Sequence, residues 1–268
     1  MKHLFKLITT VILLCSASAI CNDAELTRHD SLTIAMHDSI FSSVNMRSEE
    51  GLLKTRATLE RLLNISENSW LIHHYIGLTD YNLAIMYFGA EDEKKAVKAI
   101  DLAIEHLKKS SEQKEFSETH ALLSACYGMK VGLAPIKAII YGPRSGSEMG
   151  KAKELDANNP RVHLIDGIGK MNTPAMFGGG KEKALKSLTL ADSLFAVYES
   201  EHPTLPSWGQ AEPHIWLAQI AMKDNDLKTA RKHLEAALKV KPNSNWVNYL
   251  LMPKLEKMES IAAAEDQQ

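Results

Sequence analysis

The sequence predicts an all-α fold, a solenoid in which antiparallel pairs of helices stack side by side. Three observations support this prediction. Residues 211–244 read as two short helices joined back to back, each with apolar residues at helical spacing. The packing pattern of this pair recurs at three earlier places in the chain. Turn-forming Gly, Pro, Asn and Asp residues separate the predicted helices.

The pair at 211–244 shows the pattern at its shortest. Its first helix is predicted over 212–223, with Pro213 in the first turn, where a missing N–H costs nothing. Asp226 follows a turn and is expected to cap the second helix, which ends near Val240.

The repeated pattern combines a histidine with small residues. In each first helix a histidine is followed, three residues later, by a position that is apolar in all but the third pair, and then by a small residue. The four histidines are His73, His120, His163 and His214. Each second helix carries a small residue, an apolar residue four positions on, and an alanine three positions later. Those alanines are Ala103, Ala152, Ala191 and Ala237. Small residues on facing helices let the two backbones approach closely, so each pair is expected to pack antiparallel.

This arrangement resembles the tetratricopeptide repeat, whose pattern is W-x2-L-G-x2-Y…A-x3-F…P over about 34 residues. Leu217-Ala218 stand at the Leu-Gly position, Ala230 and Leu234 at A-x3-F, and Pro242 at the closing proline, while His214 replaces the aromatic residue. The resemblance implies a right-handed superhelix of the exported bacterial type. The long helices and the export signal also resemble the periplasmic T-component proteins of some solute transporters, without a motif that secures that assignment.

The predicted organisation has four parts. Residues 1–19 form a signal peptide, and residues 20–66 form N-terminal helices or a cap. Four helix pairs fill residues 67–244, at about 67–111, 117–157, 159–199 and 211–244. Residues 245–268 form a closing helix, with Leu250, Leu251 and Leu255 toward the array and a kink at Pro253, and then a tail. A loop over 141–146 is expected to distort the start of one second helix.

The first residues indicate export. Lys2 and Lys6 precede a short apolar run, and Ala17-Ser18-Ala19 is a small-x-small cleavage site, which together predict cleavage near Ala19. A retained N-terminal anchor is the alternative. The periplasm is the favoured destination, with secretion or attachment to the envelope also open. Cleavage removes two lysines and no acid, so the formal net charge goes from −2 to −4. Such a chain is not suited to nucleic acid, and it has no later transmembrane segment.

No pattern of catalytic, cofactor-binding or metal-binding residues is evident. Of the cysteines left after cleavage, Cys21 and Cys126 are expected to be unpaired, although a disulfide between them is possible. The four histidines lie one per pair and are interpreted as core residues. Gly178–Gly180 before Lys181 lacks the phosphate-loop pattern, so a structural turn is expected, with Met176 and Phe177 tucked beneath it. The alternative class is a helical envelope enzyme with an unrecognised site.

The resemblance implies that certain positions of the first helices line a concave groove and contact a peptide, a protein segment or an apolar small ligand. Carried onto this chain, these positions are Leu71, His74, Leu78, Tyr81, Met129, Arg161, Leu164, Ile168, Met171, Asn172, Ile215, Gln219 and Met222. This face is unusually apolar, which suits an adaptable hydrophobic surface. The alternative is that flanking helices fold over the face and bury it. The sequence therefore predicts a non-enzymatic binding or scaffold protein of the cell envelope.

Overall fold

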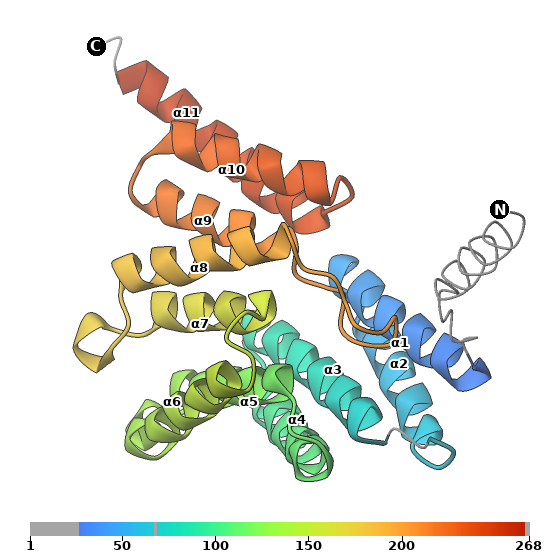
Figure 1. The fold of residues 1–268 in the computed structure, drawn as a ribbon. Coiled ribbons are helices and arrows are strands. Elements are labelled where there is room, and N and C mark those ends of the chain that lie inside the picture. The colour runs from blue at the N-terminus through green and yellow to red at the C-terminus, as the bar shows by residue number, and fades with distance from the viewer. Residues whose placement is uncertain (1–26, 67–68, 266–268) are drawn as a thin grey trace, which may run out of the picture.

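The computed structural model describes residues 27–66 and 69–265, and in these ranges it contains helices and no strand (Figure 1). The all-α prediction is confirmed, because helices that follow one another in the chain pack as adjacent pairs. The predicted signal peptide and Cys21 lie outside the described residues. None of the described helices is both long enough and apolar enough to cross a bilayer.

The structure contains eleven α-helices within the described residues. They are α1 (Arg28–Asn45), α2 (Glu49–Leu62), α3 (Ser69–Gly89), α4 (Glu93–Gln113), α5 (Ser117–Leu133), α6 (Ala138–Leu155), α7 (Pro160–Asn172), α8 (Lys181–Phe195), α9 (Glu212–Lys223), α10 (Leu227–Val240) and α11 (Met252–Glu265). Short 3-10 turns, η1 (Pro135–Lys137) and η2 (Ala175–Phe177), join α5 to α6 and α7 to α8, and a π-helical turn, η3 (Val247–Leu251), precedes α11.

Side-chain caps start several of these helices. Asp226 accepts a hydrogen bond from the backbone N–H of Thr229 at 3.1 Å, which confirms the predicted cap of α10. Asp92 does the same for Lys95 at 3.0 Å, and Asn159 accepts from the Arg161 N–H at 2.9 Å. Each cap satisfies a backbone donor that has no partner within its own helix.

Glycine allows the closest helix approach in two of the pairs. A Cβ on Gly77 of α3 would lie 2.6 Å from Leu107 Cγ, and one on Gly167 of α7 would lie 2.7 Å from Leu188 Cγ. Both glycines stand at the small position that follows the repeated histidine by four residues. The repeated sequence pattern is therefore a pattern of backbone-to-side-chain contact between paired helices.

The predicted loop over 141–146 is wrong. These residues belong to α6, which contains Pro143, and the chain instead turns earlier, at η1. Pro143 lies on an exposed side of α6, where a carbonyl that has lost its intrahelical donor can be solvated. An exposed proline can thus remain inside a helix that the sequence pattern would have ended.

The closing helix also differs from its prediction. Leu250 is 51% exposed and does not face the array, whereas Val247, Leu251 and Leu255 are buried. The cause is the π-helical turn before Pro253, because a π turn adds a residue and rotates the apolar stripe relative to a regular α-helix.

Cys126 lies in the core of α5 as a buried free thiol. Burial raises the pKa of this thiol well above its ordinary value, so the side chain behaves as a small apolar residue. Because Cys21 lies outside the described residues, the expectation that the two cysteines are unpaired stays a prediction.

We expect Gly167→Ala to lower the free energy of unfolding by about 1–3 kcal/mol, because the added methyl group overlaps Leu188 in a packed interface. Gly169→Ala in the same helix is the matched control. No atom lies within 4 Å of its added methyl group, so a gain of about 0.5–1 kcal/mol is expected from helix propensity. Urea denaturation of both variants measures the difference, and equal stabilities would contradict this account of the pair interface.

Candidate binding groove

A non-helical segment contacts α1, α3 and α7, which are the first helices of three pairs. This segment, residues 196–210, joins α8 to α9 and is called the strap (Figure 1). The Tyr75 hydroxyl of α3 donates to the carbonyl of Thr204, and Arg161 Nε of α7 donates to the carbonyl of Trp208 at 2.8 Å. The Trp208 ring stacks on Phe41 of α1, with ring centroids 5.7 Å apart. The strap is therefore bound to three helices that lie far apart in the sequence.

The strap is shaped by residues that disfavour a helix. Pro203 and Pro206 lack backbone donors, and Gly209 has a φ of 106°, which favours glycine. A Cβ on Gly209 would also lie 2.7 Å from the Phe195 ring. The sequence analysis gives flanking helices as the elements that would bury this groove. The structure corrects this, because a connector with an irregular backbone of turns and bends covers it instead.

The predicted groove residues separate into two groups. The side chains now buried are Leu71, His74, Leu78, Arg161, Leu164, Ile215 and Met222. Those that keep some exposed surface lie toward the C-terminal ends of the first helices and are Tyr81, Met129, Ile168, Met171, Asn172 and Gln219.

The set does not form one open site, because its apolar members belong to three hydrophobic clusters. Leu71 lies in the cluster of the N-terminal pairs, Leu164 in that of α7 and α8, and Ile215 in that of α9 and α10. In the strap-covered conformation a ligand can reach only the second group.

A buried ion pair lies beneath the strap. Arg161 Nη1 of α7 is 3.0 Å from Glu118 Oε1 of α5, and both side chains are at most 1% exposed. Asn159 Nδ2 donates to the same carboxylate oxygen at 3.1 Å, while the Arg161 guanidinium lies 4.7 Å from the centroid of the Tyr198 ring. Burial raises the pKa of Glu118, and the Arg161 charge opposes that shift. Charged groups so deeply buried persist only when they pair with one another.

Within the described residues, several polar atoms around this pair are buried without a hydrogen-bond partner. They are His74 Nε2, Glu118 Oε2, Arg161 Nη2 and Trp208 Nε1. His74 Nδ1 lies 2.9 Å from Thr119 Oγ1, so Nε2 carries the proton when the hydroxyl donates to Nδ1. Donors then outnumber acceptors among these atoms. An unpaired buried polar group costs about 1–3 kcal/mol. The strap accepts hydrogen bonds from Tyr75 and Arg161 Nε but leaves these four atoms unpaired.

The repeated histidines have separate partners. His73 Nδ1 lies 2.9 Å from His106 Nδ1, and His214 Nδ1 lies 3.4 Å from His233 Nδ1, which gives α3–α4 and α9–α10 the same pairing. Burial together with the neighbouring His73 lowers the pKa of His106 to about 4, so this pair is neutral at pH 7. The histidines serve individual pairs and do not converge on one point. Among residues 27–66 and 69–265 no group of three His, Cys, Asp or Glu side chains could hold a metal ion.

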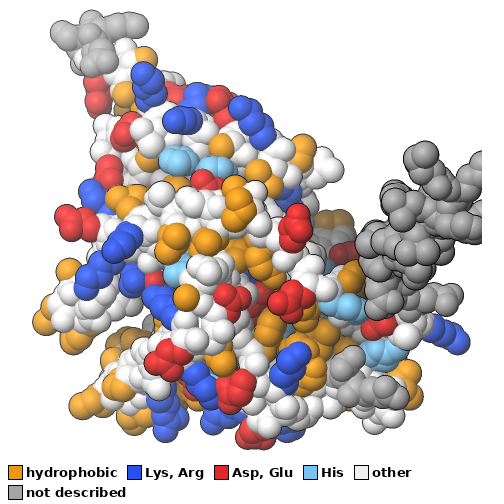
Figure 2. All heavy atoms as spheres, in the orientation of Figure 1, with side chains coloured by type: hydrophobic (Ala, Val, Ile, Leu, Met, Phe, Trp, Pro, Cys, Tyr) orange, Lys and Arg blue, Asp and Glu red, His pale blue; other side chains and the backbone are white. Residues whose placement is uncertain are grey.

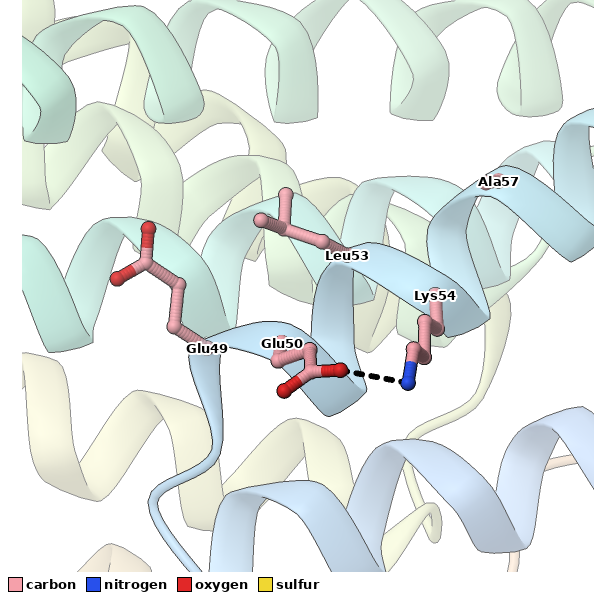
Figure 3. A pocket seen from close by; sticks show the side chains of 5 residues that line it. All are labelled: Glu49, Glu50, Leu53, Lys54 and Ala57. Carbon is pink, nitrogen blue, oxygen red and sulfur yellow. Dashed lines mark ion pairs between the residues drawn. The ribbon is translucent and has the colours of Figure 1, made fainter.

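Two surface hollows are lined by none of the predicted groove residues. One, of about 520 Å³, is open to solvent over α2 and is lined by Glu49, Glu50, Leu53, Lys54 and Ala57 (Figure 3). Glu50 and Lys54 pair with each other there at 2.6 Å, and both are well exposed, which suits a solvated helix face more than a ligand site.

The second hollow belongs to the groove. It measures about 230 Å³, lies between α1, the strap and the start of α9, and is lined partly by His37, Phe41, Trp208 and Glu212. These residues were missed from the sequence because a strap contact depends on where a loop folds back. The one available signal was the presence of Trp208 and two prolines in a connector.

Comparison with known proteins supports the fold alone. No family model matches the chain, and no curated protein matches its sequence. Among solved structures it is similar to the HusA haemophore from Porphyromonas gingivalis, with a TM-score of 0.58 and 22% identity over 70% of this chain and 92% of the haemophore. Yeast Tom70 matches with a TM-score of 0.25 and 14% identity over 92% of this chain and 66% of Tom70, which is too distant for any argument. The chain is thus an all-α protein of paired helices whose fold is similar to that of HusA.

Acid should destabilise the protein through His74. Burial lowers the pKa of this side chain to about 3, against about 6.5 in the unfolded chain. The unfolded state binds more protons, so the stabilising contribution is present above pH 6.5 and is lost as the pH falls toward the folded value. At pH 5 this histidine alone should cost about 2 kcal/mol. Urea denaturation at pH 7 and pH 5 measures the loss. His74→Gln should reduce the difference between the two pH values, and an unchanged difference would rule out this role.

Proposed function

We propose that this chain is an exported, non-enzymatic binding protein of the cell envelope, built on a tetratricopeptide-like scaffold. Its ligand is an apolar molecule that carries a carboxylate, and it enters the groove on the first helices by displacing the strap. The observation that carries this proposal is the pair of unpaired buried donors at His74 and Arg161, beside apolar groove walls.

The chemistry of the groove supports this ligand class. Leu71, Leu78 and Leu164 provide apolar walls, while the unpaired N–H groups of His74 and Arg161 can donate to an anionic oxygen. The partly exposed methionines Met129 and Met171 are flexible enough to adapt to a bulky apolar body.

Haem is the first ligand to test. It combines a flat apolar macrocycle with carboxylates, and the similar solved structure is that of a haemophore. A peptide or protein segment that presents a C-terminal carboxylate meets the same description less fully, because its backbone adds polar groups that the apolar walls would leave unpaired.

Ile168→Asp combined with Met171→Asp should weaken haem binding at least tenfold, which corresponds to about 1.4 kcal/mol. The two new carboxylates would lie against the apolar macrocycle and would repel the carboxylates of haem. Both side chains keep some exposed surface on α7, so the variant should fold. Leu190→Asp is the matched control, since Leu190 is 41% exposed on the partner helix α8. Absorbance titration with haem measures the three affinities. Equal affinities of the three proteins would exclude the groove as the haem site. If the unaltered protein bound a peptide with a C-terminal carboxylate but not haem, the ligand would instead be a peptide or protein segment.

Phe41→Ala tests the role of the strap separately. It removes the ring of α1 on which Trp208 stacks, and so should release the strap more often. Because a site that is open only part of the time binds with reduced apparent affinity, this variant should bind haem more tightly. Hydrogen exchange at residues 196–210 should rise in parallel. Faster exchange without tighter binding would show that the strap does not compete with the ligand.

A further inference from the structure

Two consecutive turns expose large apolar side chains at one edge of the molecule. At η1 and the start of α6, Ile136 is 91% exposed and Ile139 is 83% exposed. At η2, Met176 is 84% exposed and Phe177 is 73% exposed, which corrects the expectation that both tuck beneath the turn. Figure 2 shows hydrophobic side chains at the left edge, where Figure 1 places η2. These four residues are called the apolar tips.

The turns themselves hold the tips outward. At η2 the Phe177 and Gly179 N–H groups both donate to the carbonyl of Pro174, and the Gly180 N–H donates back to the carbonyl of Lys170 at 2.9 Å. A Cβ at Gly179 would lie 2.0 Å from the Thr173 carbonyl oxygen, so the turn is closed tightly on its own backbone. No room remains beneath it for an aromatic ring. At η1 the Lys137 N–H donates to the carbonyl of Ala134 at 2.8 Å in a turn that Pro135 begins.

The charged residues in the sequence around the apolar tips are basic. Residues 119–147 contain three basic residues and no acid, and residues 167–181 contain two basic residues and no acid. Several of these cations are already neutralised, since Lys130 pairs with Asp101, Lys170 with Asp166, and Lys181 with Asp224.

Other cations near the tips remain available. Within the part of the chain that the structure describes, Lys137 and Arg144 have no carboxylate partner, and Lys183 donates to the carbonyl of Gly178. The turns of the neighbouring pairs carry Glu91–Glu93 and Asp224–Asp226 and are acidic, unlike η1 and η2.

We propose that this edge docks on an anionic lipid bilayer, with the apolar tips inserted into the interface and Lys137, Arg144 and Lys183 against the headgroups. Separate projections that point outward cannot enclose a small ligand, which needs a concave site. A fluid interface can accept separate projections, and exposed apolar residues with basic neighbours are typical of membrane-surface contacts. The inference is independent of the proposed groove function, because no tip belongs to the groove.

Vesicle co-sedimentation tests this proposal with protein expressed from the full chain. The probes are vesicles of phosphatidylcholine alone and vesicles that contain phosphatidylglycerol as well. Binding should favour the anionic vesicles and weaken at high salt. The triple change Ile136→Ser, Ile139→Ser and Phe177→Ser should lower the partition coefficient at least tenfold. The change Lys137→Gln with Lys183→Gln should remove the preference for anionic vesicles while retaining part of the binding.

The matched control changes three exposed apolar residues elsewhere, Val197→Ser, Tyr249→Ser and Leu250→Ser, which are 79%, 78% and 51% exposed. It should bind vesicles like the unaltered protein. Circular dichroism and thermal unfolding verify that the tip variant folds, as expected for fully exposed positions. Equal partition of the tip variant and the control would overturn the proposal. Loss of a protein partner from the tip variant, with vesicle binding unchanged, would assign the edge to a protein interface instead.

Discussion

The ion pair between Arg161 and Glu118 is the contact on which the centre of this structure depends. It joins α7 to α5, and Arg161 also binds the strap through the carbonyl of Trp208 and lies over the Tyr198 ring. Removing one partner of such a buried pair typically costs about 3–5 kcal/mol, whereas exposed pairs such as Glu50–Lys54 contribute about 0–1 kcal/mol. The pair therefore positions two helix pairs and the segment that covers them.

This dependence connects stability with binding. Arg161, which holds the strap through the carbonyl of Trp208, also has an unpaired donor, as does the buried His74. A ligand that satisfied these donors would compete for the same surface as the strap, so its affinity would include the cost of releasing residues 196–210. The apolar tips at η1 and η2 lie outside this competition. Contact with a surface and occupancy of the groove can therefore occur together.

Much of the fold could be predicted because its signals are local. The bounds of α9, its Pro213 and the Asp226 cap of α10 matched the sequence pattern, since each depends on residues a few positions apart. Gly77 and Gly167 marked the close approach of paired helices for the same reason. The failures at Pro143, Leu250 and Phe177 share another cause. Each depends on which side of a helix or turn faces solvent, and neighbours along the chain do not decide that.

The sequence by itself determined most of the helices, the Asp226 cap and the pairing of adjacent helices, because hydrophobic periodicity and small residues act over one helix and its nearest neighbour. Only the tertiary structure decided the state of the groove. The bond from Tyr75 to Thr204 spans 129 residues, and the contact of His37 with Ser207 spans 170. No local pattern encodes such contacts. They depend on the summed rotation of successive helix pairs, which brings α1, α3 and α7 within reach of one connector.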